Sequence, residues 1–163
     1  MQIISAVLLT DQEIVISNIP QIADVLALID LLASMGVEVK KISDDTYSFK
    51  AANVNMDFMT TPEYRKRASS LRGSVMVLGP LLTRFGRAYL PKPGGDKIGR
   101  RRMDTHLIGF QNLGATFNFD SEEHFFSDIL EQIPNFSVFN ILFIPLDFSE
   151  SLMDISGSSA VGR

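Results

Sequence analysis

The spacing of hydrophobic residues divides the first part of the chain into alternating helices and strands. Apolar residues 3–9 predict a helix, and the β-branched run 13–17 predicts a strand that ends in a turn at residues 18–20. Apolar residues then recur every three or four positions over residues 21–35, which predicts an amphipathic helix. Gly36 is its expected end, because glycine readily adopts the left-handed conformation that closes many helices.

The same patterns predict a hairpin and, further on, a strand and a helix. Residues 37–41 alternate in polarity, and residues 46–50 are expected to form the return strand after a turn at residues 44–45. A short strand is predicted at residues 87–90, and a helix from about Asp104 to Asn112. Together these elements predict a mixed α and β fold.

A long helical region is predicted between the hairpin and the strand at 87–90. Thr61 is expected to cap it, with Pro62 at the first helical position, where the missing amide hydrogen costs nothing. The region is predicted to run to Phe85, with a break or kink near residues 79–80, Gly-Pro.

A weak internal repeat accompanies these elements. Residues 29–39 match residues 107–117 at an offset of 78, and in both copies a helix leads through a glycine, Gly36 or Gly114, into a strand. Any helix–Gly–strand junction would look similar, so one interpretation is coincidence. The other is a duplicated α/β unit in which each copy needs neighbours to cover its apolar face.

Composition and charge exclude some classes of function for this chain. The 163 residues suffice for one domain with a core, and the net charge of −4 argues against a general nucleic-acid binder. The chain has no cysteine, which excludes a disulfide framework and a thiolate site, and its two histidines, His106 and His124, make a histidine-rich metal site unexpected. No signal peptide or apolar run of membrane-spanning length is recognisable, so a cytoplasmic location is expected.

The most informative segment is a glycine-rich turn followed by a basic cluster, residues 93–106. Backbone amides freed by glycines and fixed guanidinium groups attract phosphate or carboxylate oxygens, so the segment predicts an anion site. A solvated basic loop is the alternative. Asp96 lies alone among these cations, as either an ion-pair partner or a proton-transfer group.

Two sequence blocks resemble the UDP-N-acetylglucosamine 1-carboxyvinyltransferases. Residues 71–86, LRGSVMVLGPLLTRFG, and residues 93–99, PGGDKIG, occur in the order and at the spacing of that family. The resemblance covers about residues 2–126. It implies an α/β (α+β) fold of inside-out, barrel-like domains built from repeated βαβαββ units, incomplete here. Related 3-phosphoshikimate carboxyvinyltransferases share the fold, but the PGGDKIG loop points away from them.

The resemblance implies transfer of the enolpyruvyl group from phosphoenolpyruvate to the 3-hydroxyl of UDP-N-acetylglucosamine. Phosphate is released, and the product is the first committed intermediate of peptidoglycan synthesis. Both substrates are the implied partners, and neither a metal nor an organic cofactor is implied. No nucleic acid or membrane partner is expected.

The resemblance also assigns roles to individual residues. Asp96 occupies the loop position where many members have cysteine, and it is the implied proton donor. Arg72 and Arg101 match arginines that contact the anionic substrates. Further matched residues are expected to line the nucleotide: Arg102, Met103, Asp104 and Thr105. Three more residues could close the loop or contact phosphate, although a simple role as surface residues would explain them equally well: Lys97, Arg100 and His106.

Three departures from the family pattern lead us to expect no independent turnover. A Lys-Asn pair, whose lysine helps bind phosphoenolpyruvate, precedes the family segment that begins here at Met1. The second domain, with its general-base aspartate, has no counterpart, and the sequence after Phe126 does not match the family's continuation. We therefore expect residues 1–126 to be a partial transferase domain and residues 127–163 a divergent tail, interpreted as a frameshifted or misassembled end. Uncovered apolar surface would favour self-association.

A function of a different class stays open beside this one. Seven of the 15 basic residues lie between Arg84 and Arg102, with Asp96 as the one acid there, so residues 84–102 could form a non-catalytic anion- or nucleic-acid-binding module. The acidic overall charge and the lack of aromatic residues interleaved with the basic ones argue against it.

Overall fold

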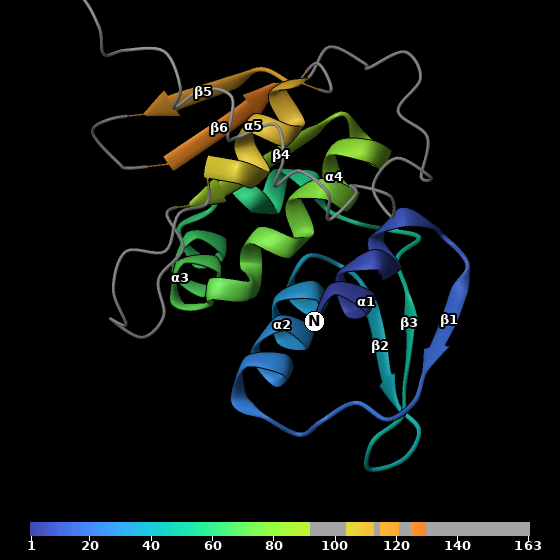
Figure 1. Ribbon diagram of the computed structural model, residues 1–163. Helices are drawn as coiled ribbons and strands as arrows, with labels where there is room; N and C mark the ends of the chain where they lie inside the picture. The colour runs from blue at the N-terminus through green and yellow to red at the C-terminus, as the bar shows by residue number, and fades with distance from the viewer. Residues whose placement is uncertain (92–103, 113–114, 121–124, 130–163) are drawn as a thin grey trace, which may run out of the picture.

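The computed structural model describes residues 1–91, 104–112, 115–120 and 125–129 (Figure 1). Within these ranges the chain forms helices and two three-stranded sheets, as the mixed pattern predicted. The predicted loop residues 92–103 and the tail beyond residue 129 lie outside the described residues.

The first unit contains one sheet and the helices beside it. Its elements are, in chain order, α1 (Gln2–Ser5), the 3₁₀ helix η1 (Ala6–Leu9), β1 (Glu13–Ile16), α2 (Ala23–Ser34), β2 (Glu38–Lys41) and β3 (Tyr47–Lys50). The strand order is β1-β3-β2, with β3 antiparallel to both neighbours. These positions confirm the predicted helices, strands and hairpin to within two residues.

Gly36 ends α2 in the predicted left-handed conformation, with a φ of 97°. A Cβ atom at this position would lie 2.5 Å from the backbone oxygen of Asn53. The neighbouring carbonyl of Met35 accepts a hydrogen bond of 2.8 Å from the amide of Asn55. The segment after β3 therefore packs closely against the end of α2, at a distance that only glycine permits.

The second unit repeats the arrangement of the first. A helical segment leads into β4 (Arg87–Pro91), α5 (Asp104–Asn112), β5 (Phe117–Asp120) and β6 (Phe125–Ile129). The strand order β4-β6-β5 matches β1-β3-β2, because in each sheet the last strand lies between the first two. This shared topology favours the duplicated α/β unit over a chance match. The two sheets formed by the described residues do not close into a barrel. The expected boundary at residue 126 falls within β6.

The long helical region between the sheets is broken elsewhere than predicted. The 3₁₀ helix η2 (Met56–Thr60) is followed by α3 (Pro62–Ser70), the 3₁₀ helix η3 (Arg72–Val77) and α4 (Leu78–Phe85). Thr61 caps α3 as expected, accepting a hydrogen bond from the amide of Tyr64. The break lies at Leu71, which is extended, and not at residues 79–80. Pro80 is tolerated because it lies in the first turn of α4, where amides have no partner within the helix.

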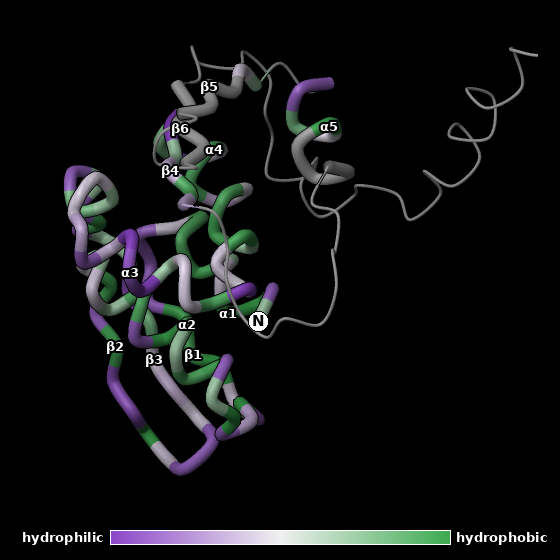
Figure 2. Tube along the Cα trace, turned by 90° about the vertical axis from the view of Figure 1, so that its left-hand side faces the viewer, coloured by the Kyte–Doolittle hydropathy of each residue, from purple (hydrophilic) through white to green (hydrophobic). Residues whose placement is uncertain are grey.

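One apolar core joins the two units. Fully buried side chains come from η1, α2 and β3 of the first unit and from α4 and β4 of the second, among them Leu8, Leu32, Phe49, Leu81 and Leu90. In Figure 2 the hydrophobic colouring is strong along α1 and α4, whereas the tip of the β2–β3 hairpin is hydrophilic. Within the described ranges, no helix has the length and apolar character needed to cross a membrane.

Candidate functional site

Arg72 is the one predicted substrate contact whose side chain the structure describes. It is the first residue of η3 and is half-buried. The next residue, Gly73, faces the start of the chain, because a Cβ atom there would overlap the Cε atom of Met1. The fold therefore brings the backbone beside Arg72 against the side chain of Met1, the residue that precedes α1.

Three of the other predicted site residues lie at the start of α5. Asp104, Thr105 and His106 form the first turn of α5, which confirms the helix predicted at 104–112. The remaining candidates lie outside the described residues: Asp96, Lys97, Arg100, Arg101, Arg102 and Met103.

Two arginines at the start of the basic stretch have partners within the fold. The Nη1 atom of Arg84 donates to three backbone carbonyl groups, at 3.0 Å to Leu8, 2.9 Å to Thr10 and 2.8 Å to Ala51. Arg87 forms an exposed ion pair of 3.5 Å with Asp57. Arg84 thus serves the fold, which weakens the interpretation of residues 84–102 as one free basic surface.

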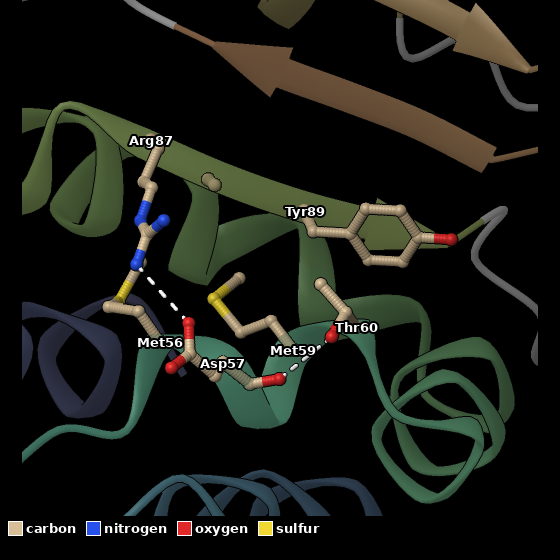
Figure 3. Close-up of a pocket in the computed structure, with 7 residues that line it drawn as sticks. Met56, Asp57, Met59, Thr60, Arg87 and Tyr89 are labelled. Atoms are coloured by element: carbon tan, nitrogen blue, oxygen red, sulfur yellow. Dashed lines mark hydrogen bonds and ion pairs between the residues drawn. The ribbon is translucent and has the colours of Figure 1, made fainter.

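A small pocket lies between η2 and β4 (Figure 3). Its volume is about 120 Å³, and it is lined by Met56, Asp57, Met59, Thr60, Arg87, Ala88 and Tyr89. Sites for drug-sized ligands are typically about 300–1,000 Å³, so this pocket cannot enclose a sugar nucleotide. No local sequence pattern indicates this pocket, because it arises where segments thirty residues apart meet. None of the predicted site residues lines it.

Tyr64, which bonds to the pocket residue Tyr89, has a raised pKa. Its side chain is fully buried, and its hydroxyl donates a hydrogen bond of 2.9 Å to the carbonyl oxygen of Tyr89. Burial raises the pKa of Tyr64 well above its ordinary value, and repulsion from an ionised Tyr89 raises it further. Tyr64 is therefore a neutral structural donor and not an acid or base for catalysis. Among the described residues, no cluster of histidine and carboxylate groups could hold a metal ion.

Comparison with known proteins places these features in a family. A family model described as EPSP synthase (3-phosphoshikimate 1-carboxyvinyltransferase) matches residues 1–133. A UDP-N-acetylglucosamine 1-carboxyvinyltransferase from Porphyromonas gingivalis is 58% identical over 122 residues, covering 75% of this chain and 28% of the relative. One of the same name from Bacteroides fragilis is 51% identical over 138 residues, covering 85% of this chain and 32% of the relative.

A solved structure agrees at the level of the fold. The enolpyruvyl transferase NikO from Streptomyces tendae matches with a TM-score of 0.58 and 18% identity, covering 80% of this chain and 27% of that one. In each of these comparisons the chain spans less than a third of the protein that it matches.

Proposed function

Because the chain belongs to the EPSP synthase (3-phosphoshikimate 1-carboxyvinyltransferase) family, we propose that it carries part of the substrate site of a UDP-N-acetylglucosamine 1-carboxyvinyltransferase. The observation that carries the proposal is the 58% identity over 122 residues to a relative of that name. The complete site would transfer the enolpyruvyl group of phosphoenolpyruvate to the 3-hydroxyl of UDP-N-acetylglucosamine, the first committed step of peptidoglycan synthesis. A cytoplasmic location and a barrel-like domain are part of the same proposal.

The chemistry of this transfer assigns a task to each candidate residue. A proton is added to the methylene carbon of phosphoenolpyruvate, and the sugar hydroxyl attacks the adjacent carbon as it gives up its own proton. The tetrahedral intermediate then loses phosphate together with a proton from the new methyl group, which restores the carbon–carbon double bond. Asp96 would supply the proton, which requires its carboxyl group to be protonated when substrate binds. Arg72 and Arg101 would hold the carboxylate and phosphate groups. The residues proposed to line the nucleotide are Arg102, Met103, Asp104 and Thr105.

The position of Arg72 supports its role. Met1 packs against Gly73, the neighbour of Arg72, so the start of the chain and the start of η3 lie together. A half-buried guanidinium group there would attract the carboxylate or phosphate of phosphoenolpyruvate. The start of α1 and the start of η3 would therefore form one wall of a phosphoenolpyruvate site. Lys97, Arg100 and His106 stay candidates for further phosphate or loop contacts.

We do not expect this chain to turn over substrate alone. A reaction that adds an alcohol to an enol phosphate needs both walls of a closed cleft, which orient the reactants and exclude water. The chain supplies less than a third of the length of its relatives. The proposal therefore limits the chain to binding and to part of the catalytic loop, within the residues 1–133 that the family model matches.

A chimera tests the proposal. Residues 1–122 of this chain would replace the matching part of the Porphyromonas gingivalis relative, and phosphate release would be measured with both substrates. We expect release by the chimera, and a loss of about 100- to 10,000-fold on Asp96→Ala, the range attributed to general acid catalysis. Asp57→Ala, which changes an exposed carboxylate away from Arg72, is the control. A folded chimera that releases no phosphate, or one that Asp96→Ala leaves unchanged, would refute the proposal.

A further inference from the structure

Arg84 connects three segments that are far apart in sequence. Its Nη1 atom donates to the carbonyl oxygens of Leu8 and Thr10, at the end of η1, and of Ala51, directly after β3. Its guanidinium carbon also lies 5.0 Å from the centre of the Phe85 ring. One side chain of the second unit therefore occupies the point where a helix and a strand of the first unit end.

The two helical segments that Arg84 joins run side by side in the same direction. At one end, Met1 packs against Gly73, the neighbour of Arg72. At the other end, the carbonyls of Leu8 and Thr10 accept hydrogen bonds from Arg84. Contacts between α1 and η3, and between η1 and α4, lie between these ends. The α1–η1 segment and the η3–α4 segment are also the equivalent first helical elements of the two repeated units.

Electrostatics explains why a cation occupies this position. The last carbonyl groups of a helix have no partner within it and carry partial negative charge, which a guanidinium group neutralises. All three hydrogen bonds come from one nitrogen atom, so the site does not require the paired donor nitrogens of a guanidinium group. An ammonium group with its three N–H donors meets the same demand, whereas an apolar side chain leaves three carbonyls without this donor.

We propose that Arg84 is a positioning residue for Arg72. By fixing the far end of the contact between α1–η1 and η3–α4, Arg84 prevents these segments from sliding, and the near end, where Met1 packs against Gly73 next to Arg72, keeps its register. The role of Arg72 in this inference rests on the proposed function, whereas the register between the segments does not. A misplacement of about 1 Å can cost about 100-fold in an enzyme site, so the register matters to any anion held by Arg72.

Spin labels test the register without a ligand. The chain has no cysteine, so the double variant Gln2→Cys, Arg72→Cys has two thiols to label, one on each segment near the proposed site. Dipolar broadening in the electron paramagnetic resonance spectrum then reports how closely and how uniformly the labels lie. We expect strong broadening in this background, loss of it on Arg84→Met, and retention on Arg84→Lys. Arg67→Met is the control, because Arg67 pairs with Asp30 and Glu63 on the surface.

Ligand affinity tests the consequence for Arg72. In the chain with its native Arg72, titration with phosphoenolpyruvate should show about 10- to 100-fold weaker binding on Arg84→Met and a change within about threefold on Arg84→Lys. Each variant is compared at a temperature where circular dichroism shows it folded, so a purely structural role would leave the affinity unchanged. If Arg84→Met does not fold, Arg84→Gln, which keeps N–H donors without the charge, replaces it.

The outcomes separate the two proposals. Broadening that survives Arg84→Met, or that is absent even with Arg84 in place, overturns the positioning role. So does an affinity for phosphoenolpyruvate that Arg84→Met leaves intact. If the unaltered chain folds but binds no phosphoenolpyruvate, the proposed function fails, and the spin-label result still decides whether Arg84 fixes the register.

Discussion

The hydroxyl of Tyr64 donates a hydrogen bond of 2.9 Å to the carbonyl oxygen of Tyr89 and thereby joins α3 to β4. The Tyr64 ring is fully buried, with the ring of Phe58 at its edge, 6.1 Å between centroids. Because α3 lies in the helical region between the two sheets and β4 begins the second sheet, this contact fixes that helical region to the second sheet.

Removing the Tyr64 hydroxyl should destabilise the chain measurably. Tyr64→Phe keeps the buried ring but leaves the Tyr89 carbonyl without this donor, so the free energy of unfolding should fall by about 1–2 kcal/mol. Urea unfolding followed by circular dichroism measures the change. Tyr47→Phe is the matched control, because its hydroxyl bonds to the exposed Gln21, which water can satisfy, and we expect a change below about 0.5 kcal/mol. Equal losses in both variants would contradict the special role of Tyr64.

Tyr64 should also make the stability sensitive to alkaline pH. Burial, with added repulsion from Tyr89, raises its pKa in the folded chain, while in the unfolded chain it titrates near the ordinary value of about 10. Above that pH the folded state binds the proton that the unfolded state has lost, so the free energy of unfolding falls as the pH rises. The stability difference between the unaltered chain and Tyr64→Phe should therefore shrink from pH 8 to pH 11. A difference that stays constant would show that Tyr64 ionises equally in both states.

The helices and strands were predictable where neighbouring residues alone determine them, through hydrophobic spacing or through residues that favour turns and helix ends. Apolar spacing, Gly36 and the Thr61–Pro62 pair identified α2, the first hairpin and the start of α3. The break at Leu71 was not predictable from the Gly-Pro pair, because the effect of Pro80 depends on where the helix begins. That start is set by tertiary packing of η3 and α4 against α1 and η1, which a local pattern does not contain.

The two glycines with opposite surroundings give a second stability test. Gly36→Ala requires a left-handed alanine with its Cβ 2.5 Å from the backbone oxygen of Asn53, so we expect a loss of at least about 2 kcal/mol. Gly109 lies in α5, and a Cβ there meets none of the described residues within 4 Å. Gly109→Ala should be neutral or stabilise the chain by up to about 1 kcal/mol. Urea unfolding of both variants would refute this account if Gly36→Ala proved no more costly than Gly109→Ala.

The family was predictable from the sequence, whereas the site residues stay predictions. The resemblance named Arg72, Asp96 and Arg101, and the relatives found agree with the family that it named. Nothing in the sequence indicated that Gly73, next to Arg72, would pack against Met1, or that Arg84 would bind three carbonyl groups of the first unit. Such contacts arise from long-range packing between repeats, so single-sequence patterns could not assign them.

The central claim is that this chain retains part of a sugar-nucleotide and phosphoenolpyruvate site, and calorimetric titration tests it most directly. The purified chain, shown to unfold cooperatively, would be titrated with UDP-N-acetylglucosamine in the presence and absence of phosphoenolpyruvate. We expect saturable binding that Arg72→Ala and Arg101→Ala each weaken by at least about tenfold, the loss of one charged hydrogen-bonding group. Arg67→Ala, on the exposed face of α3, should leave it unchanged. A cooperatively folded chain that binds neither ligand would contradict the claim.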